Sequence, residues 1–176
     1  MRWEALFEDM EAQLAAARGA ELRADVAELT RAERATVHLV DRVRSAVGGP
    51  VTLRLAAGEP VRGVVLDAAP QWVLLDAGGV RRALVPTGAV VAVGGLPAHA
   101  APPAGTVERR LGLGHALRAL ARDRVVVRVR LASGDVAGRV ERVGADHVDL
   151  VEDGARAAVR TCWSVPFAAV LVVASG

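Results

Sequence analysis

The chain lacks several residue types altogether. Its 176 residues include no Lys, Ile, Asn or Tyr and only one Cys, and aromatic residues make up 3%. Because Lys is absent, all 22 basic residues are Arg, and the 20 acidic residues reduce the formal net charge to +2. This surplus is small for a protein that binds polyanions through its overall charge. A single cysteine cannot form an internal disulfide, which favours a reducing compartment.

The N-terminal segment does not have the pattern of a secretory signal peptide. Acidic Glu4, Glu8 and Asp9 lie where a signal peptide would have an uninterrupted apolar stretch. The longest run without Asp, Glu or Arg, residues 83–107, is broken by Pro and Gly. It therefore indicates a strand followed by a linker and not a membrane span. With 52% hydrophobic residues, we expect a folded cytoplasmic protein that contacts no membrane.

The sequence contains an internal duplication. Three blocks recur in the same order: 51–59 with 127–135, 66–75 with 141–150, and 85–93 with 165–173. We call residues 51–93 the first repeat and residues 127–173 the second repeat. Three matching blocks with few gaps indicate that one segment was copied.

Each repeat has the alternation of a β protein. Apolar and polar residues alternate over 51–55 and again over 127–131, which predicts strands with one buried face. Five short strands per repeat favour a small closed barrel. The fold prediction is therefore mainly β with helices: two tandem five-stranded barrels of Sm-like or SH3-like type, each preceded by a helix. The predicted organisation is an N-terminal helical segment over 1–34, a first barrel unit over 35–95, a linker over 96–105 and a second barrel unit over 106–176.

The N-terminal segment has an apolar stripe at helical spacing, formed by Trp3, Phe7, Met10 and Leu14. Such a stripe indicates packing against the barrels or against another copy of the chain, and these four residues are candidate partner-binding residues. Thr30 and Glu33 fit a capping box, which predicts that the helix before the first barrel starts there.

The pattern of both repeats resembles the Sm-like family, which includes bacterial Hfq and the archaeal and eukaryotic Sm proteins. The resemblance rests on matching Leu and Gly positions in each repeat: Leu55, Gly58, Gly63 and Leu75, and Leu131, Gly134, Gly138 and Leu150. It implies ring assembly through strand edges and binding of uridine- or adenine-rich RNA. The family's base-binding residues are absent. Its Asn in the loop before the third strand aligns near Trp72 in the first repeat and His147 in the second, and the chain has no Asn. The first residues, Met1–Phe7, also resemble an uncharacterised actinobacterial family.

Arginines are concentrated in residues 107–142, where nine Arg against four acidic residues give a local charge of +5. Arg offers bidentate hydrogen bonds to phosphate, and release of counterions adds affinity. The alternative is that these arginines pair across strands with Asp135 and Glu141. The candidate nucleic-acid-binding residues are Arg54, Arg124, Arg128, Arg130, Arg139 and His147, the last of which lies beside Asp146 in a predicted loop.

No residue pattern in the sequence indicates catalysis. The histidines are scattered and there is one cysteine, so no metal-ligand spacing is present, and we expect no metal, no cofactor and no enzyme. Cys162 is expected to be a buried thiol and not a nucleophile. Trp72 and Trp163 are expected to cap the cores.

Two functions follow as hypotheses. The first is a non-enzymatic protein that binds nucleic acid, RNA in particular, through the arginines of the second repeat. The alternative is an assembly or adaptor module that binds other proteins, or further copies of itself, through strand edges or the N-terminal helix.

Overall fold

The computed structural model describes residues 2–79, 81–152 and 161–175, and the chain divides into two units, Met1–His38 and Leu39–Gly176. The first unit is one long helix, α1 (Arg2–Thr36), which continues through Gly19. The predicted helix start at Thr30 is wrong, because Thr30 lies inside α1 and its hydroxyl donates a hydrogen bond to the carbonyl of Val26, at 2.8 Å. This bond back to the preceding turn is the alternative to capping that Thr side chains use within helices.

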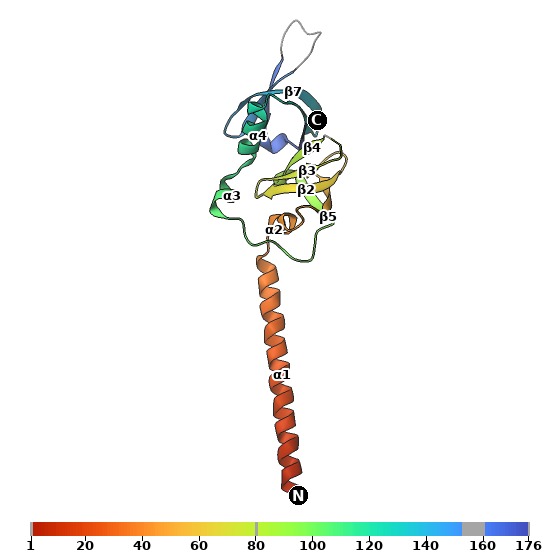
Figure 1. Ribbon diagram of the computed structural model, residues 1–176, viewed down its shortest axis with the longest axis vertical. Helices are drawn as coiled ribbons and strands as arrows, with labels where there is room; N and C mark the ends of the chain where they lie inside the picture. The colour runs from red at the N-terminus through yellow and green to blue at the C-terminus, as the bar shows by residue number, and fades with distance from the viewer. Residues whose placement is uncertain (1, 80, 153–160, 176) are drawn as a thin grey trace. The chain divides into compact units, whose positions relative to one another are not determined.

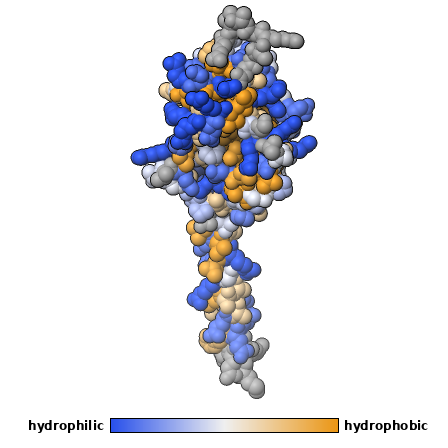
Figure 2. All heavy atoms as spheres, turned by 45° about the horizontal axis from the view of Figure 1, so that its top comes forward, coloured by the Kyte–Doolittle hydropathy of each residue, from blue (hydrophilic) through white to orange (hydrophobic). Residues whose placement is uncertain are grey.

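The candidate partner-binding residues of α1 are at its surface. Phe7, Met10 and Leu14 are exposed, and Figure 2 shows apolar and charged side chains side by side along this helix. Trp3 lies in α1, but its side chain is outside the described part of the structure. Nothing in the first unit covers the described stripe, so its role in partner binding stays a prediction.

The second unit is built on strands, several of which are labelled in Figure 1. The strands of the first repeat are β1 (Pro50–Leu55), β2 (Val61–Ala69), β3 (Trp72–Asp76), β4 (Arg82–Pro86) and β5 (Val90–Gly94). Those of the second repeat are β6 (Val126–Leu131), β7 (Gly134–Val143), β8 (His147–Val151), β9 (Cys162–Pro166) and β10 (Val172–Ser175). The short 3-10 helices η1 (Thr87–Ala89) and η2 (Phe167–Ala169) precede β5 and β10.

The strands form one ten-stranded antiparallel sheet in the order β5-β1-β2-β3-β4-β10-β6-β7-β8-β9. The prediction of two closed five-stranded barrels is therefore wrong. Closure would require the fourth and fifth strands of the same repeat to pair, whereas β4 of the first repeat pairs with β10 of the second. The two repeats are thus joined into one open sheet, which ends at β5 and β9.

Within this sheet the repeats pair their strands in the same register. Thr52 lies opposite Gly94 in the first repeat, and the equivalent Arg128 lies opposite Ala174 in the second. The register shift between β2 and β3 falls at residue 66, and that between β7 and β8 falls at the equivalent residue 141. The equivalence found in the sequence therefore extends to individual residue pairs.

The sheet passes between two hydrophobic cores at the β4–β10 pair. On β4, Ala83 and Val85 belong to the core of the first repeat, whereas Leu84 between them belongs to that of the second. On β10, Val172 and Val173 divide in the same way. Because side chains alternate between the faces of a strand, both faces of this pair are buried. We call the β4–β10 pair the internal junction.

Helices pack against both repeats. The helix α2 (Leu39–Arg44) lies over β2 of the first repeat, and α4 (Leu113–Arg122) lies over β7 and β8 of the second. In place of the one helix expected before the second barrel, there are two, α3 (Thr106–Arg110) and α4, separated by two residues of which Gly112 is the N-cap of α4. None of the helices in the described ranges is both long and apolar enough to cross a membrane.

The equivalent glycines Gly63 and Gly138 provide a stability test. A Cβ atom at Gly63 would overlap the carbonyl oxygen of Asp76, and one at Gly138 would overlap that of Val151. We expect Gly63→Ala and Gly138→Ala each to destabilise the fold by about 1–3 kcal/mol, because the paired strands must move apart. Urea denaturation measures this, with Gly88→Ala as the control, since a Cβ there has no atom within 4 Å. Equal stability of all three variants would contradict the close strand approach.

Candidate assembly interface at the sheet edges

The arginines of the predicted nucleic-acid site contact groups of the protein itself. A guanidinium nitrogen of Arg128 lies 3.6 Å from the Asp135 carboxylate, which is the cross-strand pairing named as the alternative. Arg130 donates a hydrogen bond to the carbonyl of Glu59, at 2.9 Å, and so connects the two repeats. Arg54 lies on β1 of the first repeat and is exposed.

Two of the predicted arginines share one hollow. Arg124 and Arg139 line a cavity of about 390 Å³ together with Glu141, whose carboxylate offsets part of their charge. Arg124 follows α4 in the left-handed region, with φ 52°, at a position after a helix end where Gly is usually found. The structure thus brings two of the six predicted residues to one hollow and gives Arg128 and Arg130 protein partners.

His147 belongs to a polar network that reaches the sheet edge. It is the first residue of β8, not part of a loop, and its Nδ1 lies 2.9 Å from the carboxylate of Asp146. Its Nε2 lies 4.0 Å from the carboxylate of Asp149, which is buried. Asp149 accepts hydrogen bonds from Ser164 Oγ on β9, at 2.6 Å, and from Arg142 Nε, at 3.0 Å. These two donors hold the pKa of Asp149 below its usual value.

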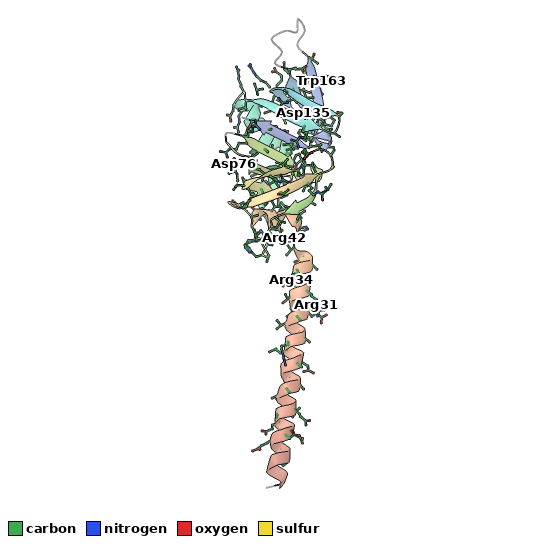
Figure 3. The ribbon with its side chains drawn as sticks, turned by 90° about the vertical axis from the view of Figure 1, so that its right-hand side faces the viewer. Arg31, Arg34, Arg42, Asp76, Asp135 and Trp163 are labelled. Carbon is green, nitrogen blue, oxygen red and sulfur yellow. The ribbon has the colours of Figure 1, made fainter. Side chains whose placement is uncertain are left out.

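The edge strand β9 differs from both expectations placed on it. Cys162 is exposed and not buried, and Trp163 is 48% exposed and does not close the second core, whereas Trp72 is buried as expected. Figure 3 labels Trp163 near one end of the sheet unit. The sequence prediction was wrong here because β9 has a paired strand, β8, on one side only among the described residues.

The two edges match the internal junction position by position. Residues of β9 are equivalent to those of β4 at a difference of 80, and β5 is equivalent to β10 at the same difference. Leu171, the residue that precedes β10, is 6% exposed, and Ala83 on β4 is 3% exposed. Their equivalents at the edges, Val91 and Trp163, are 65% and 48% exposed. The edges therefore expose apolar side chains at positions whose equivalents are buried in the core of the first repeat.

In the described part of the chain, no three or more His, Cys, Asp and Glu side chains are close enough to hold a metal ion. Sequence reasoning identified the arginines but did not identify β5 and β9 as two edge strands that could pair with each other. The signal was present in the duplication, since apolar Val91 and Trp163 align with Leu171 and Ala83, which are buried in the core of the first repeat.

No protein-family model matches the chain, and no curated protein matches it.

The Asp149 network gives a pH prediction. A carboxylate whose pKa is lowered in the folded state stabilises the fold above its unfolded pKa of about 3.9, and this stabilisation is lost as the pH falls through the lower, folded value. We expect Asp149→Asn to lower stability at pH 7 and to weaken the loss of stability on acidification below pH of about 4. Thermal denaturation from neutral to acidic pH measures both effects, with the exposed Asp135→Asn as control. A parallel decline in all three proteins would contradict the role of Asp149.

Proposed function

We propose that this chain is a self-assembling protein in which β5 of one copy pairs with β9 of the next. The observation that carries this proposal is the difference in exposure between the edges and the internal junction. Exposed edge strands have unpaired backbone donors and acceptors and readily accept another strand. Here each edge also exposes an apolar side chain whose equivalent is buried in the junction or directly beside it, so pairing would remove both the backbone groups and these side chains from water.

The internal junction supplies the expected register. Within the chain, Val173 lies opposite Leu84 and Ala174 lies opposite Ala83. If β5 and β9 pair as their equivalents β10 and β4 do, Val93 of one copy lies opposite Ser164 of the next. Gly94 then lies opposite Trp163 of the next copy. Because the two edges are different surfaces, this contact is head-to-tail, and copies joined in this way form a ring or a filament.

The start of α2 supports the same arrangement. Leu113 at the start of α4 is 5% exposed, and its backbone N–H donates a hydrogen bond to Oε1 of Gln71, in the turn between β2 and β3 of the first repeat, at 3.1 Å. Leu39 at the start of α2 is 52% exposed. A neighbouring copy placed as at the internal junction would bring its Asp146, which precedes β8 and is equivalent to Gln71, against Leu39.

Nucleic-acid binding stays a prediction of the sequence. The exposed Arg54, Arg124 and Arg139 favour it, whereas the protein contacts of Arg128 and Arg130 use part of the charge on which it depends. Self-assembly is the stronger proposal because the chain already contains one example of the pairing that it requires.

A charge placed on one edge tests the proposal. Val91→Lys puts an ammonium group where pairing would bury a side chain, so we expect the dissociation constant for self-association to rise at least about tenfold, equivalent to 1.4 kcal/mol. Sedimentation velocity over a dilution series measures this constant. The matched control is Val126→Lys, which changes an exposed valine on β6, away from both edge strands. Equal association of the two variants would contradict the edge contact.

Cysteine pairs test the register. In a Cys162→Ser chain, Val93→Cys with Ser164→Cys should form a disulfide between copies under mild oxidation, because the two residues would lie opposite each other. Val91→Cys with Ser164→Cys is the out-of-register control and should cross-link much less. Non-reducing electrophoresis detects the products. Equal cross-linking by both pairs, or none by either, would argue against this register.

A further inference from the structure

Trp163 leaves a large apolar surface exposed at the sheet edge. Its side chain lies on β9, opposite Leu150 of β8, and its indole N–H has one long hydrogen bond, 3.5 Å, to the carboxylate of Glu152. Tryptophan is among the residues that contribute most to binding energy when a partner surface covers them. Its position on β9, which pairs with β8 on one side only among the described residues, points to a contact with another protein strand.

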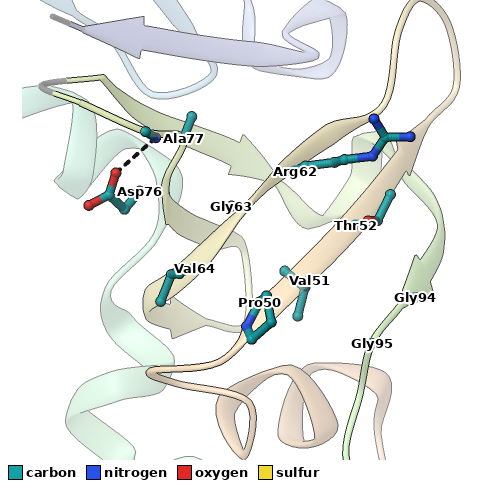
Figure 4. A pocket seen from close by; sticks show the side chains of 11 residues that line it. Pro50, Val51, Thr52, Arg62, Gly63, Val64, Asp76, Ala77, Gly94 and Gly95 are labelled. Atoms are coloured by element: carbon teal, nitrogen blue, oxygen red, sulfur yellow. Dashed lines mark hydrogen bonds between the residues drawn. The ribbon is translucent and has the colours of Figure 1, made fainter.

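A hollow lined in part by glycines lies beside the other edge of the sheet. It has a volume of about 600 Å³ and is lined by Pro50, Thr52, Arg62, Gly63, Gly94 and Gly95, among others. Figure 4 shows Thr52 and Arg62 on neighbouring strands along this hollow, with Gly94 and Gly95 on the adjacent segment. Thr52 lies opposite both Gly94 and Arg62, so these three residues share one face of the sheet.

We infer that Trp163 of one copy occupies the glycine-lined hollow of the next copy. This inference rests on the proposed edge pairing, whose register places Trp163 opposite Gly94. Directly opposite residues of an antiparallel pair project to the same face. The indole therefore projects on the face of the sheet where Gly94, Thr52 and Arg62 line the hollow.

The sizes of the paired residues fit this contact. At the internal junction the equivalent pair is Ala83 and Ala174, two small side chains. At the edges the same position combines the largest side chain with a residue that has none. A Cβ atom at Gly94 would have no neighbour closer than 4.0 Å, so the glycine is not required by crowding within its own chain. A partner's tryptophan supplies a reason for its small size, and Arg62 lies where its guanidinium can stack on an aromatic ring.

Two substitutions test the inference from opposite sides of the contact. Trp163→Ala removes the side chain that fills the hollow, and Gly94→Leu fills the hollow from within, so each should raise the dissociation constant for self-association at least tenfold. Trp163→Phe should restore part of the affinity. Gly88→Leu is the matched control, because Gly88 also has room for a side chain and its equivalent, Ala168, stays exposed beside the internal junction.

Fluorescence places the indole directly. The emission lost in Trp163→Phe is the Trp163 component, and we expect its quenching by acrylamide to fall as the full-length chain associates. Thermal denaturation shows whether each variant folds, and a variant that fails to fold is replaced by Gly94→Val or Trp163→Leu.

The outcomes separate this inference from the proposed function. If the cysteines at 93 and 164 cross-link but Trp163→Ala and Gly94→Leu associate like the parent chain, the edge pairing holds and the hollow does not receive Trp163. If the cysteines do not cross-link and the chain stays monomeric, the proposed function itself fails. Unchanged acrylamide quenching of Trp163 on association would also overturn the inference.

Discussion

The pairing of β4 with β10 is the constraint on which the architecture of the sheet unit depends. It joins the two repeats through backbone hydrogen bonds and buries alternate side chains in two different cores. A five-stranded repeat by itself would expose one face of these strands to water. The internal junction therefore stabilises both repeats together, and it determines which strands, β5 and β9, are left at the ends of the sheet.

The joining of the two repeats also explains why some of the residues predicted to bind a ligand contact the protein itself. Arg130 contacts the carbonyl of Glu59 in the first repeat, and its methylene groups lie near Gly58. Trp72 of the first repeat donates a hydrogen bond to the carbonyl of Leu111, which precedes α4. The Arg130 contact crosses from one repeat to the other, and the Trp72 contact reaches the segment before the second repeat. Arg130, a ligand-binding candidate in the sequence, therefore has a structural partner within the chain.

Sequence periodicity predicted the strands well, because alternation depends on local burial. The segments 51–55 and 127–131 were expected as strands and lie within β1 and β6. The partners of β4 and β10 could not be predicted in the same way. An apolar run such as Val170–Val173 has the same sequence pattern whether its strand pairs within its own repeat or with the other repeat. Cys162 and Trp163 were misjudged for the same reason, since their burial depends on a strand that the described chain does not place beside them. Of the candidate site, the arginine positions were readable from the sequence, whereas their contacts with Asp135 and Glu59 were not.

The fusion of two repeats in one chain also affects any larger array of copies. Neighbouring repeats in such an array are never the same, since each first repeat is followed by a second one. Mutations in one repeat therefore change every other position and leave the intervening positions as they were. In the proposed array this alternation would let the second repeat keep its arginines while the first repeat keeps its glycines, so that one chain would present two distinct surfaces in a regular order.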